Sequence, residues 1–171
     1  MPKKRRWVRK IFSLLVIIFV VIQFFQPDKN NNDVIAKNDI GTMLPMSDTV
    51  QQLLKTSCYD CHSNNTYYPW YSNIQPTGWW LKNHIEDGKK HLNFNEFVTL
   101  PPRNGKTTRQ RQDKKLQEIK ETIDEDEMPL NSYLWIHHNA KLNAAQKKLI
   151  GDWADSARKT LSQLPALVDA K

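Results

Sequence analysis

The chain has 171 residues, which is enough for one compact domain with short flanking segments, and its 25 Lys and Arg outnumber its 18 Asp and Glu. Six of the basic residues lie in the first ten positions, which leaves 19 basic against 18 acidic residues in the rest. Because nucleic-acid binding needs a basic surface on the folded domain, this balance argues against a nucleic-acid partner.

The N-terminus has the order of an export signal. A basic segment at residues 1–10 precedes an apolar run from Ile11 to Phe25 that only Ser13 and Gln23 interrupt. No small-x-small cleavage site follows the run. The pattern predicts a cytoplasmic segment at 1–10 and an uncleaved transmembrane anchor at 11–25, so that one pass through the cytoplasmic membrane leaves the rest in the periplasm. A cleaved signal peptide is the alternative.

Residues 26–46 are predicted to form a polar tether. The stretch Asp28–Asp33 is polar and unpatterned, and the few apolar residues that follow are too sparse to indicate a core. The alternative is an ordered arm that packs on the domain.

Residues 47–171 are predicted to fold as one small all-α domain. Their apolar residues recur at three- and four-residue steps, and no convincing strand pattern is present. Helices are expected at 47–57, at 77–92, at 108–124 and from an N-cap at Asn143 onward. Trp153 is expected in the core, and 93–106 is expected to be a loop because it carries Pro101-Pro102 and Asn104-Gly105.

The first of these helices leads into Cys58-Tyr59-Asp60-Cys61-His62, and the chain has no other cysteine. CxxCH is the attachment motif of a c-type haem, in which two thiols bind the vinyl groups and the histidine ligates iron. We therefore predict one covalent haem c on Cys58 and Cys61, with His62 as the proximal ligand. Residues 47–171 would then be a small cytochrome c-like helical domain around one haem.

Three other interpretations of the cysteine pair remain open. A structural zinc site usually needs four ligands from two such pairs, and only one pair is present. A thioredoxin-like redox pair needs a βαβ context, which the helical pattern does not suggest. A disulfide between the two would close a very short loop and stabilise little.

The opposite face of the iron is predicted to bind Met128. The proline that follows disfavours helix at Met128 and indicates a loop from which the thioether can reach the metal. His84 is the second candidate, and an open iron site is the third. Trp70 and Trp80 are predicted to lie against the haem, because a flat apolar ring favours large flat neighbours.

Three-quarters of the chain resembles a bacterial family of haem-binding domains, exported monohaem c-type cytochromes. The resemblance rests on Cys58–Asn64, Tyr68–Ser72, Pro76, Trp79-Trp80, His84–Gly88, Glu127–Pro129, Tyr133, His137, Ala140–Leu142 and Trp153. It implies covalent haem binding and electron transfer, and it assigns no substrate or partner.

The function predicted from the sequence is one-electron transfer on the periplasmic side of the membrane, with redox proteins as partners. An electron carrier is favoured over an enzyme because no acid–base pair or nucleophile stands out. The alternatives are a haem peroxidase or gas sensor with open iron, and a non-haem metal-binding module.

Overall fold

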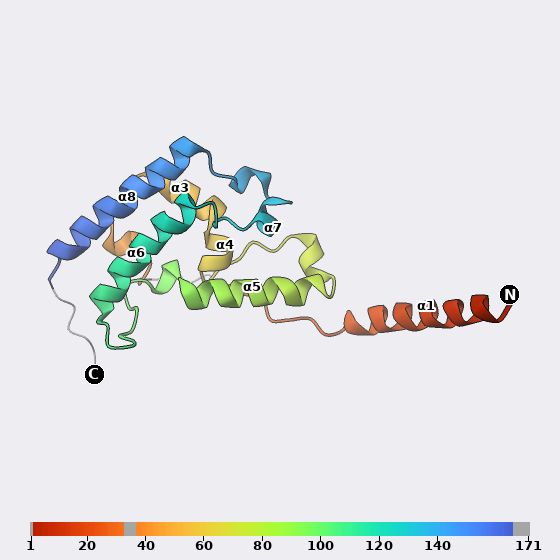
Figure 1. The fold of residues 1–171 in the computed structure, drawn as a ribbon. Helices are drawn as coiled ribbons and strands as arrows, with labels where there is room; N and C mark the ends of the chain where they lie inside the picture. The colour runs from red at the N-terminus through yellow and green to blue at the C-terminus, as the bar shows by residue number, and fades with distance from the viewer. Residues whose placement is uncertain (1, 33–36, 166–171) are drawn as a thin grey trace.

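The structure is a computed structural model that describes residues 2–32 and 37–165, and every regular element in these ranges is helical (Figure 1). The α-helices are α1 (Pro2–Ile22), α2 (Ile40–Met43), α3 (Asp48–Ser57), α4 (Tyr59–His62), α5 (Thr77–His91), α6 (Thr108–Asp124), α7 (Asn131–Leu134) and α8 (Ala144–Gln163). Three short 3-10 turns join them: η1 (Trp70–Asn73), η2 (Phe94–Glu96) and η3 (His138–Ala140). The predicted all-α class is confirmed.

Side-chain caps explain where three of the four long helices of the domain, α3, α6 and α8, begin. The Ser47 hydroxyl accepts a hydrogen bond from the Val50 N–H at 3.3 Å and starts α3. Asn143 is the N-cap of α8, as predicted, and it forms a capping box with Gln146. A second capping box starts α6, between Thr107 and Gln110.

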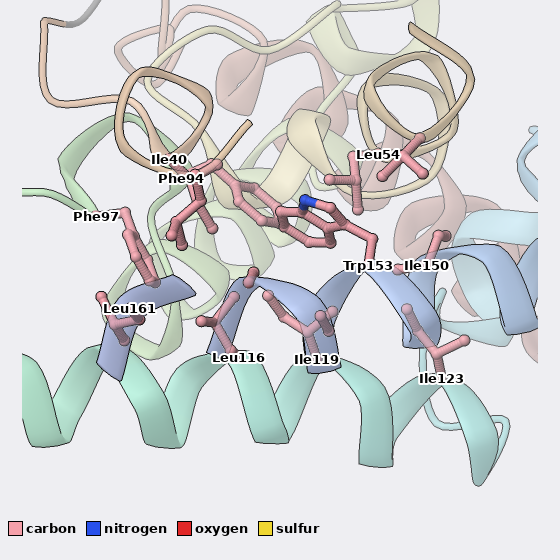
Figure 2. Close-up of a cluster of buried hydrophobic side chains, with 14 of the residues drawn as sticks. Ile40, Leu54, Phe94, Phe97, Leu116, Ile119, Ile123, Ile150, Trp153 and Leu161 are labelled. Atoms are coloured by element: carbon pink, nitrogen blue, oxygen red, sulfur yellow. The ribbon is translucent and has the colours of Figure 1, made fainter. Parts of the chain in front are cut away.

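The core lies where α3 covers the antiparallel pair of α6 and α8 (Figures 1 and 2). Helix α6 contributes the predicted stripe of Leu116, Ile119 and Ile123, all of them buried. Trp153 of α8 is buried as predicted, and its indole N–H donates to the Pro45 carbonyl at 3.2 Å. Helix α6 is therefore fixed by its packing against α8. Its other face is available to the cysteine motif.

The predicted tether is, in its described parts, an arm packed on the domain. Ile40 and Leu44 are fully buried in the core, and the Asn30 side chain donates to the Ser63 carbonyl and the Thr66 hydroxyl, each at 2.9 Å. The flexible tether at 26–46 was thus wrong for these residues, because the few apolar side chains there find buried partners. Residues 33–36 lie outside the described ranges.

Replacing Leu44 with alanine is expected to cost about 2–5 kcal/mol of the free energy of unfolding, as for other fully buried leucines. Leu149→Ala is the matched control, because Leu149 of α8 is largely exposed and its loss should change stability by no more than about 0.5 kcal/mol. Denaturant unfolding of both variants tests this. If both substitutions change the free energy of unfolding by the same small amount, this segment is a flexible tether.

The N-terminal helix differs from the predicted membrane anchor at 11–25. Helix α1 begins at Pro2 and ends at Ile22, so the basic residues Arg5 to Lys10 belong to the same helix as the apolar run. In the described part of the chain, no helix combines the length and the apolar character that crossing a membrane requires. The predicted transmembrane anchor is therefore not supported.

The end of α1 is hydrogen-bonded to the start of α5. The Gln75 N–H donates to the Gln23 side-chain oxygen at 2.9 Å, and the Trp79 indole donates to the Phe25 carbonyl at 2.8 Å. The segment after α1 is thus joined to the domain at Gln23 and Phe25.

Candidate functional site

The cysteine motif is a short helical turn that breaks away from α3. Cys58 ends α3, and its N–H donates to the Leu54 carbonyl at 2.9 Å. Its backbone then leaves the helical region, with φ −130° and ψ −40°, and α4 starts in a new direction. The His62 N–H returns to the Cys58 carbonyl at 3.0 Å. One turn therefore carries both thiols and the imidazole.

The two residues between the cysteines fix this turn on opposite sides. The Tyr59 ring stacks on Phe94 with centroids 4.8 Å apart, and its hydroxyl donates to Asp39 at 3.2 Å. The Asp60 carboxylate accepts from the Tyr133 hydroxyl at 2.7 Å, and burial with this carboxylate raises the pKa of Tyr133. Tyr59 and Asp60 thus hold in place the turn that carries Cys58, Cys61 and His62.

Helix α5 lies directly against the motif because Gly88 has no side chain. A Cβ atom at Gly88 would lie 2.7 Å from the Cys61 carbonyl oxygen, which is too close for van der Waals contact. Glycine at position 88 thus allows the backbones of α5 and the motif to approach closely.

Gly88→Ala is therefore expected to push α5 away from the motif and to cost about 1–3 kcal/mol of stability, as overpacking does. Gly151→Ala in α8 is the control. A Cβ there would meet only the flexible Lys120 side chain at 3.6 Å, so this variant should gain about 0.5–1 kcal/mol from helix propensity. Thermal unfolding and haem content of both variants measure the contrast, and equal effects would contradict it.

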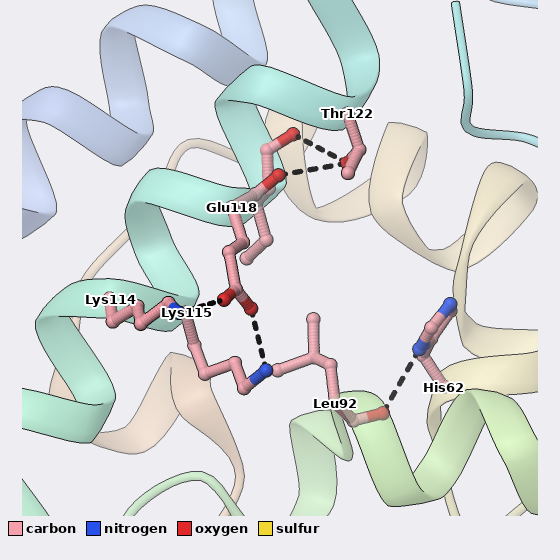
Figure 3. Close-up of polar contacts among 7 residues, drawn as sticks. His62, Leu92, Lys114, Lys115, Glu118 and Thr122 are labelled. Carbon is pink, nitrogen blue, oxygen red and sulfur yellow. Dashed lines mark hydrogen bonds and ion pairs between the residues drawn. The ribbon is translucent and has the colours of Figure 1, made fainter.

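His62 is oriented by the end of α5 (Figure 3). Its Nδ1 lies 3.0 Å from the Leu92 carbonyl oxygen, and since a carbonyl only accepts, Nδ1 carries the proton. Burial lowers the pKa of His62, so the imidazole is neutral at neutral pH. The lone pair is therefore on Nε2, on the ring edge that points away from Leu92. Histidines that ligate metals are commonly held in this way.

The two thiols are not bonded to each other. Burial raises the pKa of the Cys58 thiol to about 12 and that of Cys61 to about 11, with smaller contributions from neighbouring negative charge. Dithiol redox pairs lower a cysteine pKa instead, so the thioredoxin-like alternative has no support. The described ranges also contain no group of three or more His, Cys, Asp or Glu side chains that could hold a metal ion.

Two cavities meet at the motif. The larger has a volume of about 380 Å³, which lies within the range of small-molecule sites, and the smaller has about 200 Å³. Both are lined by Ser57, Cys58, His62, His91 and Met128. Leu92, Phe94, Ile119 and Ile123 give the larger cavity apolar walls. An apolar space beside two thiols and an imidazole nitrogen fits the donor groups and the ring of a haem.

The structure brings Met128 to this space through the turn that ends α6. Asp126 adopts a left-handed conformation with φ 60°, and the Glu127 N–H donates to the Thr122 carbonyl at 2.9 Å. These features, with the Asp126 N–H donating to the Ile123 carbonyl at 3.3 Å, form a Schellman cap. Met128 follows directly and lines both cavities.

Of the other three predicted site residues, His84, Trp70 and Trp80, only His84 lines one of the two cavities. His84 lines the smaller cavity, with its Nδ1 2.9 Å from the Trp80 carbonyl oxygen. Trp80 itself packs on the His84 ring and lines neither of the two cavities. Trp70 does not line them either and is 75 % exposed. The structure thus does not place Trp70 and Trp80 in the walls of this site.

Sequence reasoning missed two groups of cavity residues. His91 was not among the predicted site residues, although it follows His84 by two helical turns and lines both cavities. Helix α6 also lines the larger cavity with Lys115, Glu118 and Thr122, which flank its buried stripe. Their helical spacing is visible in the sequence, but which face of α6 meets the motif is not.

A helical domain that presents CxxCH beside an apolar cavity defines a haem-binding protein. The model of the haem-binding domain family matches residues 17–156, which include the whole site. The chain therefore belongs to the haem-binding domain family. No significant match was found among curated proteins or among solved structures.

Proposed function

We propose that this haem-binding domain is a monohaem c-type cytochrome that transfers single electrons. Cys58 and Cys61 would hold the haem covalently, His62 would be the proximal ligand and Met128 the distal one. The observation that carries the proposal is the neutral His62, whose Nδ1–H is engaged by Leu92 and whose Nε2 is left for the metal, on the same turn as two free thiols. The haem would supply the one-electron iron couple.

The residues of the chain would bind, orient and shield that group. Each thiol would add across one vinyl double bond, so that a C–S bond forms and the thiol hydrogen moves to the adjacent carbon, with no net oxidation. The Leu92 carbonyl would keep the His62 ring in one orientation. Leu92, Phe94 and Ile119 would exclude water from the ring.

The test is haem retention by the full chain, produced together with a c-type haem maturation system. The protein is denatured in acid and extracted with organic solvent, and the pyridine haemochrome spectrum of the protein fraction is recorded. One haem per chain, with the band position of two thioethers, is the expected result. Haem that is fully extracted would contradict covalent attachment.

Electron transfer is favoured over an open-iron enzyme or gas sensor because Met128 and His91 both line the space beside His62. A six-coordinate iron should bind carbon monoxide slowly and incompletely at neutral pH. Rapid, stoichiometric binding to the reduced protein would show an open site and support the peroxidase or sensor alternative.

The location and the partners remain predictions. The basic segment at 1–10 followed by an apolar run at 11–22 favours export of the domain to the periplasmic side, where bacteria attach c-type haem. Redox proteins would be the partners. Protease accessibility of the domain in spheroplasts tests the side of the membrane on which it lies.

A further inference from the structure

The wall that α6 contributes to the larger cavity carries two charged side chains beside apolar ones. Lys115 and Glu118 line this cavity together with Ile119. Lys115 and Glu118 lie on the side of Leu92 away from His62 (Figure 3). A charged group in an apolar wall costs free energy unless it is paired. Lys115 and Glu118 therefore need partners of opposite charge.

Lys115 is paired only in part. Its Nζ lies 2.5 Å from Glu118 Oε2, while the other oxygen of the same carboxylate lies 3.3 Å from the Nζ of Lys114. Two ammonium groups thus share one carboxylate, and one positive charge is left over. The Lys114 side chain is 56 % exposed and solvated, whereas that of Lys115 is 17 % exposed. Of the two lysines, Lys115 is the one that lines the cavity.

We propose that Lys115 is the cation that pairs with a propionate carboxylate of the bound haem, and that Glu118 positions it. This inference rests on the proposed function. A haem has one edge with two carboxylates, and an otherwise apolar cavity needs a positive group for that edge. His91, at the end of α5, also lines both cavities and would be the neighbour of the second carboxylate.

The test compares Lys115→Gln with Lys114→Gln in the haem-loaded full chain. Both variants remove one lysine that pairs with Glu118, but only Lys115 lines the cavity. Resonance Raman spectra should show the propionate bending band at lower frequency in Lys115→Gln, because a hydrogen bond to the carboxylate is lost. The band should be unchanged in Lys114→Gln.

Reduction potentials give an independent readout. Loss of the Lys115 charge should favour the oxidised haem and change the equilibrium constant for electron exchange roughly tenfold, as expected for one unit charge near the iron at an effective dielectric constant of about 20. Glu118→Gln should shift the potential in the opposite direction, and Lys115→Arg should remain close to the unsubstituted protein. Should Lys115→Gln fail to fold, Glu118→Gln and Lys115→Arg still test the inference.

Two results would overturn it: a propionate band that does not move in Lys115→Gln, even with a lowered potential, or equal changes in Lys115→Gln and Lys114→Gln. Haemochrome content is measured on every sample. If the unsubstituted chain retains no haem, the proposed function fails. If it retains haem and the Lys115 spectra are unchanged, only this inference fails.

Discussion

Replacing both Cys58 and Cys61 with alanine is expected to abolish covalent haem completely. The chain has no other thiols, so no other side chain can form the thioether bonds. Each single variant should retain one bond, and its haemochrome band should shift toward the position of a haem with one free vinyl group. Denaturing gels stained for haem, with haemochrome spectra, measure both effects.

The control for this experiment is Ser57→Ala. Ser57 lines both cavities beside Cys58, but its hydroxyl donates to the Ala140 carbonyl at 2.9 Å and takes no part in attachment. This variant should lose about 1 kcal/mol of stability and keep its covalent haem. Haem that survives denaturation in the double cysteine variant would show attachment through another residue and contradict the assignment.

Met128→Ala should remove the far-red absorption band of sulfur-ligated ferric haem and lower the reduction potential. A His/Met ligand pair has a higher potential than a bis-His pair, and loss of the thioether leaves either water or a nearby histidine at the iron. His84 and His91 line the same space and are the two histidines that can replace it. Optical spectroscopy and a redox titration of the holoprotein measure the change.

Met46→Ala is the matched control, because Met46 packs against the core and lines neither cavity of the site. It should lose stability and retain both the far-red band and the potential. If the band persists in Met128→Ala, methionine at 128 is not the ligand. Parallel His84→Ala and His91→Ala variants then identify which histidine takes its place.

The helices of the domain could be predicted because the interactions that start and end them are local. Ser47 and Asn143 cap helices through bonds to residues three positions away, and these spacings are visible in the sequence. The CxxCH motif is contiguous, so its chemistry is visible in the sequence in the same way. The prediction of α6 at 108–124 matches the observed Thr108–Asp124 for this reason.

Burial of isolated apolar residues could not be predicted. Phe94 and Phe97 lie in the segment expected to be a loop, yet both are buried in the core. Ile40 and Leu44 behave in the same way in the predicted tether. None of these belongs to a long periodic pattern, and their burial depends on partners that are distant in the chain.

The sequence by itself determined the helical class, the approximate boundaries of the long helices of the domain and the group Cys58, Cys61 and His62, because each of these depends on residues only a few positions apart. The tertiary structure decided what surrounds that group. It brought Met128 and Lys115 to the cavity, left Trp70 exposed and placed Gly88 against Cys61. These relations arise because α5 packs against α4 and α6 borders the cavity beside it. A periodic pattern shows that a helix has an apolar face without showing which neighbour that face will meet.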